Sequence, residues 1–145
     1  MTDPCMSLII STSEEMEALG ARIATALRAP AVIYLRGELG AGKTTLVRGI
    51  LRELGHQGLV KSPTFTLVES YHLNSIEVHH FDLYRLNDPH ELDYIGLSEY
   101  CHANSLCFFE WPDLGAGLVP QASLTIDIAY HADGRQCLVN GLTLT

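Results

Sequence analysis

A glycine-rich loop is the sequence feature that most constrains how this chain can fold. Residues 34–51 read YLRGELGAGKTTLVRGIL, and the pattern G-x-x-x-x-G-K-[ST] is met by Gly37, Gly42, Lys43 and Thr44. Glycine-rich turns also match such a pattern by chance, so the flanking residues decide its meaning.

The residues on either side of the loop predict a strand before it and a helix after it. Residues 31–35, AVIYL, form a short apolar run rich in β-branched side chains, as in a buried strand. Residues 44–54 carry apolar side chains at helical spacing and end before Gly55, a typical helix end. The order strand, loop and helix predicts an α/β fold of the P-loop NTPase type, with a mixed, mainly parallel sheet.

This order also explains how the loop would hold a phosphate group. A helix N-terminus leaves backbone N–H groups unpaired and carries about half a positive charge, which attracts anions. Lys43 would reach the β- and γ-phosphates, and the Thr44 hydroxyl would ligate Mg²⁺. Thr45 follows one position too late for that metal contact. The nucleotide-binding residues predicted in this segment are Gly37, Glu38, Leu39, Gly40, Ala41, Gly42, Lys43, Thr44 and Thr45.

Length and composition favour one domain, residues 1–145, without a separate lid. A chain of 145 residues buries roughly two-thirds of its unfolded surface. Its apolar runs are far shorter than the ~20 residues of a membrane span, and the first residues lack the basic start of a signal peptide. We therefore expect a cytoplasmic protein. The net charge of −8 argues against direct nucleic-acid binding, so a partner would hold any nucleic acid.

Disulfide and transition-metal chemistry are not indicated by the sequence. The four cysteines show no C-x-x-C pairing and predict reduced, partly buried thiols: Cys5, Cys101, Cys107 and Cys137. His79 and His80 are adjacent in an expected strand, so their side chains point to opposite faces and do not readily share one ion.

The remaining segments predict further helices and antiparallel hairpins. A helix over residues 11–27 is expected to begin at the N-cap Thr12, with Glu15 three residues later. Residues 64–71 and 75–81 alternate around a turn and predict a hairpin.

In the second half, a helix is expected over residues 88–97, because Asp88 can cap it, Pro89 suits its first turn and Glu91 completes a capping box. Residues 105–111 predict a buried strand. Residues 112–120 predict a loop, and residues 122–144 a hairpin around Asp133–Gly134.

Two acids follow apolar runs and are candidates for the catalytic carboxylates of a nucleotide site. Glu110 ends the run CFF, as a Walker-B acid does at the carboxyl edge of a parallel sheet, and Asp82 ends VHHF in a similar way. Between the loop helix and Asp82 lies SPTF, whose Ser62 and Thr64 suit a switch-like segment or a plain strand entry. Trp111 fits either the core or the site.

Together, GELGAGKTTLVRG, SPTFTLVESY, HHFDLYRL and FFEWP resemble the small bacterial ATPase family of tRNA threonylcarbamoyladenosine biosynthesis (TsaE, formerly YjeE). The resemblance covers nearly the whole chain. It implies ATP and Mg²⁺ at the loop and slow intrinsic hydrolysis. It also implies joint action with the TsaB and TsaD proteins, which transfer a threonylcarbamoyl group to adenosine 37 of tRNAs reading ANN codons, with ATP turnover resetting their complex.

The resemblance also implies roles for individual residues. Lys43 and Thr44 match the family's phosphate and metal positions. Asp82 and Glu110 match the acids important for hydrolysis, and Trp111 the family's tryptophan. Of the two acids, we favour Glu110 on metal-bound water and Asp82 nearer the γ-phosphate, although the pattern permits the exchange.

Two other functions are compatible with the sequence. A small-molecule kinase would need an arginine-bearing lid and an acceptor pocket, for which residues 86–107 offer little room. A nucleotide-gated binding module would hold ATP without hydrolysing it alone. The sequence leaves open the hydrolysis rate, the oligomeric state, the partner surface and any direct tRNA contact.

Overall fold

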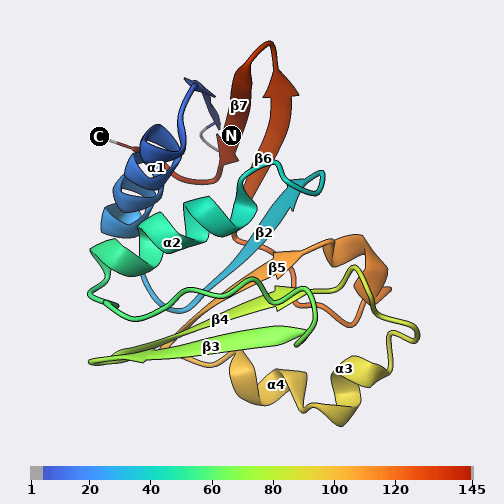
Figure 1. Ribbon diagram of the computed structural model, residues 1–145. Coiled ribbons are helices and arrows are strands. Elements are labelled where there is room, and N and C mark those ends of the chain that lie inside the picture. The colour runs from blue at the N-terminus through green and yellow to red at the C-terminus, as the bar shows by residue number, and fades with distance from the viewer. Residues whose placement is uncertain (1–4, 145) are drawn as a thin grey trace.

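The strand and helix predicted around the glycine-rich loop lie at the centre of the molecule (Figure 1). The computed structural model, which describes residues 5–144, gives β2 (Ala31–Gly37) before the loop and α2 (Lys43–Glu53) after it. β2 pairs in parallel with a strand on each side, and its Ile33 and Leu35 side chains are fully buried. An apolar run suits this position because a central parallel strand is covered on both faces.

The sheet has seven strands in the order β1-β7-β6-β2-β5-β4-β3. The four strands β6, β2, β5 and β4 run parallel, while the pairs β1–β7, β7–β6 and β3–β4 are antiparallel. This confirms the predicted α/β class with antiparallel hairpins beside a parallel centre. The strands other than β2 are β1 (Cys5–Ile10), β3 (Val68–Leu73), β4 (Ile76–Asp82), β5 (Ser105–Glu110), β6 (Leu124–His131) and β7 (Gly134–Asn140).

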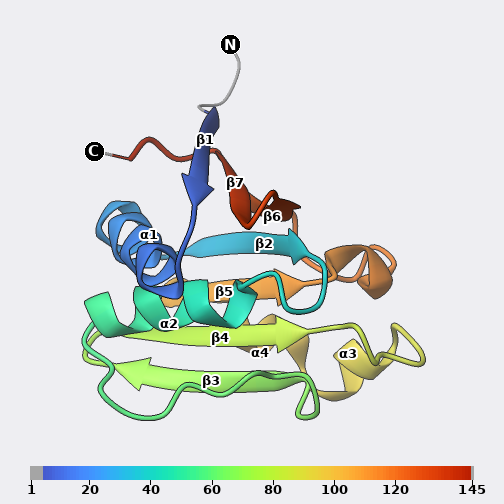
Figure 2. The ribbon, with the colours of Figure 1, turned by 45° about the horizontal axis from the view of Figure 1, so that its top comes forward.

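Helices cover both faces of the sheet, and each face has its own apolar core. Figure 2 shows the two longer helices together on one face, where they enclose the larger core. The other face is covered by short helical turns over a core centred on Phe81 and Phe109. No helix in residues 5–144 is long and apolar enough to cross a membrane. The helices besides α2 are α1 (Ser13–Ala26), α3 (Glu91–Tyr94), α4 (Leu97–Tyr100) and the 3-10 helix η1 (Pro112–Gly115).

The prediction of the first helix is confirmed, and so is the end of α2. The Thr12 hydroxyl accepts the backbone N–H of Glu15 at 3.1 Å and caps α1. Beyond α2, Gly55 adopts a φ of +107°, and the His56 N–H returns to the carbonyl of Leu51 at 2.9 Å. A residue with positive φ just after a helix, closed by this backbone bond, is a common helix end.

The strand predicted over residues 64–71 is wrong at its start, because β3 begins only at Val68. The N–H of Leu67 donates to the carbonyl of Pro63 at 3.0 Å and closes a turn over residues 63–67. Leu67 itself has a φ of +71°, which a strand residue does not adopt. The SPTF segment therefore belongs to a turn that precedes β3 in the sequence.

The helix predicted over residues 88–97 is also wrong, since it is divided into the four-residue helices α3 and α4. Gly96 separates them in the left-handed conformation, with a φ of +73°. The Asp88 carboxylate accepts the backbone N–H of His90 at 3.0 Å, as in a turn that precedes a helix. The first helical residue is Glu91, three residues after Asp88.

Three smaller differences concern the strands of the sheet and their ends. The sequence did not predict β1, which pairs with β7 from the other end of the chain. β5 ends at Glu110, because Trp111 has a left-handed φ of +56°. In the last hairpin His131 pairs with Gly134, so the turn is centred on Ala132 and Asp133, one residue earlier than predicted.

Gly49→Ala should destabilise the protein, although alanine is the better helix former. An added Cβ at Gly49 of α2 would overlap the backbone carbonyl oxygen of Glu17 in α1, so the two helices would have to separate. We expect a loss of roughly 1–3 kcal/mol in the free energy of unfolding, measured by urea denaturation. Gly58→Ala is the control, because its Cβ would meet only the side chain of His56. Equal stability of the two variants would contradict this account of the helix pair.

Candidate functional site

Ten residues of the predicted site line one cavity of about 230 Å³ at the carboxyl edge of the parallel strands. β2, β4 and β5 all end at this edge, and their register makes Asp82 and Glu110 direct neighbours. The cavity thus gathers residues from the loop, the SPTF turn and two strand ends. Its lining residues are Leu39, Gly40, Gly42, Lys43, Thr44, Thr45, Ser62, Thr64, Asp82 and Glu110.

Lys43, the first residue of α2, turns its side chain back into the loop. The side chain is 5% exposed, and its Nζ donates to the carbonyl oxygen of Gly37 at 2.5 Å. The same Nζ lies 3.3 Å from Oε1 of Glu110 and 4.7 Å from the ring centroid of Trp111. A buried ammonium group held in this way supplies a fixed positive charge to the cavity.

Glu110 is a buried carboxylate with two nitrogen partners. Its Oε2 lies 2.5 Å from Nε2 of His80, and its Oε1 faces Lys43. Burial raises the pKa of Glu110, but the hydrogen bond and charge of His80, together with the charge of Lys43, outweigh burial and leave the pKa below its ordinary value. Glu110 is therefore ionised at neutral pH.

His80 is the residue of this site that the sequence analysis missed. It is fully buried. In the sequence it was considered only as a metal ligand beside His79, and its contact with an acid was not predicted. A usable signal was present, since residues two apart in a strand share a face and His80 precedes Asp82 by two. His80 thus acts on the cavity through Glu110.

Asp82 has a different environment from Glu110. It is 3% exposed, and its Oδ1 accepts the backbone N–H of Tyr84 at 3.0 Å. Its Oδ2 accepts the hydroxyl of Thr64 at 3.4 Å, and that hydroxyl lies 2.7 Å from the hydroxyl of Ser62. Burial raises the pKa of Asp82, and the Tyr84 hydrogen bond offsets only part of this effect. The two neighbouring acids therefore differ in proton affinity.

The β6–β7 hairpin fixes the outer side of the glycine-rich loop, which the sequence did not predict. Nε of Arg135 donates to the carbonyl of Ala41 at 3.0 Å, and the Tyr130 hydroxyl donates to the carbonyl of Leu39 at 3.0 Å. The Arg135 guanidinium also lies 4.2 Å from the Tyr130 ring centroid. A second cavity, of about 260 Å³, opens between this hairpin, the start of α1 and the loop.

Some of the predicted site residues do not line the cavity that contains Asp82 and Glu110. Gly37, Glu38 and Trp111 line a separate hollow of about 390 Å³. Ala41 is 1% exposed and belongs to the second cavity, on the hairpin side. Trp111 still packs against the site, since its ring lies above the Lys43 ammonium and 5.2 Å from the Tyr84 ring.

The structure is an α/β protein with a mixed seven-stranded sheet, in which a glycine-rich loop joins the central strand β2 to α2. The family model described as "Threonylcarbamoyl adenosine biosynthesis protein TsaE" matches residues 10–137. The chain therefore belongs to the TsaE family, whose members serve tRNA threonylcarbamoyladenosine biosynthesis.

Individual relatives agree with this family. The TsaE protein of Haemophilus influenzae is 51% identical over 104 residues, a match that covers 72% of this chain and 66% of that protein, just under two-thirds of its length. The TsaE protein of Bacillus subtilis is 38% identical, over 83% of this chain and 75% of that protein. The crystal structure of B. subtilis YdiB superposes with a TM-score of 0.80 at 28% identity, covering 99% of this chain and 89% of that one.

Asp82→Asn should raise the free energy of unfolding at neutral pH. The pKa of Asp82 is raised above its ordinary 3.8, so the folded chain favours the protonated form, and stability falls as pH rises through the folded pKa. An amide removes this cost and keeps the acceptor for Tyr84. We expect a gain of roughly 0.5–2 kcal/mol at neutral pH, as for other replacements that relieve strained functional groups.

Urea denaturation across the acidic range measures this effect, and the gain should disappear below pH 3.8, where Asp82 is protonated in both states. Asp133→Asn, in the exposed hairpin turn, is the control and should change little. A lower stability of Asp82→Asn at neutral pH would contradict the assignment.

Proposed function

We propose that this chain binds and hydrolyses ATP with Mg²⁺ in the bacterial machinery that forms N6-threonylcarbamoyladenosine at position 37 of tRNAs reading ANN codons. In this proposal, residues 1–145 act as a single cytoplasmic P-loop ATPase domain with the TsaB and TsaD proteins. The observation that carries it is the cavity that joins Lys43 and Thr44 to Asp82 and Glu110 in a TsaE-family chain. The net charge of −8 is in keeping with tRNA being held by the partners.

The loop has the features that a nucleotide needs. Gly40 and Gly42 have φ values of +80° and +113°, which glycine adopts at little cost, and they precede the N-terminus of the 11-residue helix α2, where a phosphate can bind. The two cavities beside the loop share Gly40, Gly42 and Thr45. We assign the phosphates to the cavity at the acids and the sugar and base to the cavity at the hairpin.

The donor set also fits Mg²⁺. The hydroxyl of Thr44 and the ionised carboxylate of Glu110, through water, would hold the ion, which when bound neutralises charge on the phosphate oxygens. Lys43 would bind the β- and γ-phosphates, and its Nζ lies 3.3 Å from Oε1 of Glu110. The raised pKa of Asp82 suits a group that orients water and takes its proton, with Thr64 holding the carboxylate.

Phosphate release from ATP by the purified chain, alone and with the TsaB–TsaD complex and tRNA, tests the proposed function. We expect slow release alone and clear stimulation by the complex. Release without any added acceptor also separates an ATPase from the alternative, a small-molecule kinase. A rate that the complex and tRNA leave unchanged would contradict the proposed role.

Lys43→Ala should lose ATP binding, because Lys43 is the one lysine or arginine among the described residues that line the cavity. Trp111 fluorescence reports the binding, since its ring lies against Lys43. Lys61→Ala, an exposed lysine outside the cavity, is the matched control. Thr44→Ala should abolish the Mg²⁺ dependence of ATP binding, because the Thr44 hydroxyl is the proposed metal ligand. Thr45→Ala should retain that dependence. ATP affinity of the wild-type strength in Lys43→Ala would overturn the assignment of the loop.

Glu110→Ala should still bind ATP and lose most turnover, by a factor of about 10² or more, because the loop remains while the acid is removed. Fluorescence titration and single-turnover phosphate release measure the two properties separately. Glu91→Ala, an acid outside the cavity at the loop, is the control. An unchanged release rate in Glu110→Ala would exclude this carboxylate from the reaction.

A further inference from the structure

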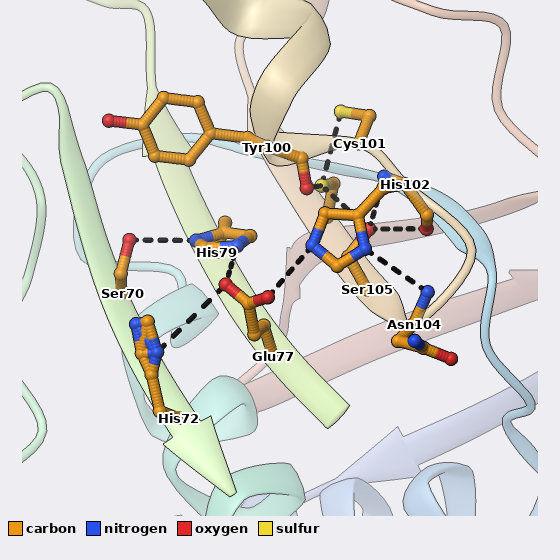
Figure 3. A network of polar contacts seen from close by, with 10 residues as sticks. Ser70, His72, Glu77, His79, Tyr100, Cys101, His102, Asn104 and Ser105 are labelled. Atoms are coloured by element: carbon orange, nitrogen blue, oxygen red, sulfur yellow. Dashed lines mark hydrogen bonds and ion pairs between the residues drawn. The ribbon is translucent and has the colours of Figure 1, made fainter. Parts of the chain in front are cut away.

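Three side chains of types that can ligate a metal lie together near the start of β4, whereas Asp82 ends this strand (Figure 3). Glu77 and His79 are two residues apart in β4 and share one face, whereas Asp82 and His80 lie on the other. His102 reaches them from the turn between α4 and β5. We propose that Glu77, His79 and His102 bind one divalent transition-metal ion, Zn²⁺ in particular.

The distances suit such an ion. Nε2 of His79 lies 3.3 Å from Oε1 of Glu77, and Nε2 of His102 lies 2.8 Å from Oε2 of Glu77. The three ligand atoms lie within 4.8 Å of one another. Ligand atoms of a tetrahedral zinc site, with bonds of about 2.0–2.2 Å, are separated by about 3.3 Å. Small side-chain movements are therefore enough to close the site.

His79 supplies a second, independent observation. It is 3% exposed, and its Nε2 is buried without a hydrogen-bond partner among the described residues. Its Nδ1 lies 2.7 Å from the hydroxyl of Ser70 on β3. When Nδ1–H donates to Ser70, the Nε2 lone pair faces the carboxylate of Glu77, and two acceptors then oppose each other. A cation between them resolves this conflict, and Ser70 orients the ring as outer partners of metal-bound histidines do.

His102 is the ligand through which the ion would enter, because its side chain is 37% exposed. Its Nδ1 now accepts the backbone N–H of Asn104 at 3.2 Å, and its Nε2–H faces Glu77. On ligation the proton moves from Nε2 to Nδ1, so no net proton is released from this ring. The Asn104 amide is then left to solvent, which its exposed turn permits.

The ligand set selects the kind of ion. Two imidazoles and one carboxylate suit Zn²⁺ and disfavour Mg²⁺, which prefers oxygen ligands. His72 of β3, whose Nδ1 lies 3.9 Å from Oε1 of Glu77, or a water molecule would complete four ligands. The adjacent residues His79 and His80 do not readily share one ion, as expected from the sequence, whereas the structure places His79 beside residues 77 and 102. The ion would fasten the start of β4 to the turn before β5.

Calorimetric titration of the full, untagged chain with Zn²⁺ tests the site. We expect one ion per chain in the wild type and at least about tenfold weaker binding in His102→Gln and Glu77→Gln. His90→Gln is the matched control, because exposed His90 pairs with Asp88 at 3.1 Å but has no second imidazole. Wild-type Zn²⁺ affinity in His102→Gln would overturn the proposal. The measurement on His102→Gln remains decisive if Glu77→Gln fails to fold.

Cysteine thiols are the competing zinc ligands, since Cys5 is exposed and Cys101 is half-buried near His102. Co²⁺ distinguishes them: the proposed site predicts tetrahedral d–d bands without a thiolate-to-cobalt charge-transfer band. The presence of that band would overturn the ligand set. Ser70 would not touch the ion, but Ser70→Ala should weaken Co²⁺ binding about 10–100-fold, because the hydrogen bond that orients His79 is lost. An unchanged Co²⁺ affinity would contradict this orienting role.

Discussion

The buried carboxylate of Glu110 is the interaction on which the rest of the site depends. A charge in the interior is tolerated only with partners, and here the partners come from two other elements, Lys43 of α2 and His80 of β4. Satisfying one carboxylate thus fixes the glycine-rich loop, β4 and β5 relative to one another. The cavity lies where these three elements meet.

Asp82 shows how the same edge gives two carboxylates different properties. It sits beside Glu110 in the register of the sheet, yet among residues 5–144 it contacts a backbone amide and the Thr64 hydroxyl and no cation directly. One acid is therefore held ionised, while the other has its pKa raised by burial. Such divergence is a frequent property of acid and base pairs in active sites. This difference supports the proposal that Glu110 holds metal-bound water and that Asp82 accepts a proton.

The sequence predicted this edge because its signals are local or follow from topology. The loop pattern lies between a strand and a helix, and parallel strands must end at one edge, which brings Asp82 to Glu110. What it did not predict depends on distant contacts. β1 pairs with β7, Arg135 reaches the loop from the last hairpin, and His102 reaches β4 from another turn. No window of local periodicity contains such pairs.

The errors in the helices and strands have a different origin. Residues 64–67 alternate as a strand does, but the turn closed by Pro63 and Leu67 takes them out of the sheet. Gly96 divides an expected helix because it can adopt a positive φ at little cost. In both places the backbone conformation of one residue outweighs a pattern of side chains. The turn also brings Thr64 to Asp82, so the departure from the expected strand serves the site.

Amide NMR of the full chain titrated with ATP and Mg²⁺ would show whether ATP binds at this edge of the sheet. We expect the largest shifts at residues 37–45, with smaller ones at Thr64, Asp82 and Glu110. Residue 77, near the start of β4, and residue 102, in the turn before β5, should be unaffected. Shifts concentrated at residues 77 and 102, or no shifts at saturating ATP, would exclude nucleotide binding at the loop.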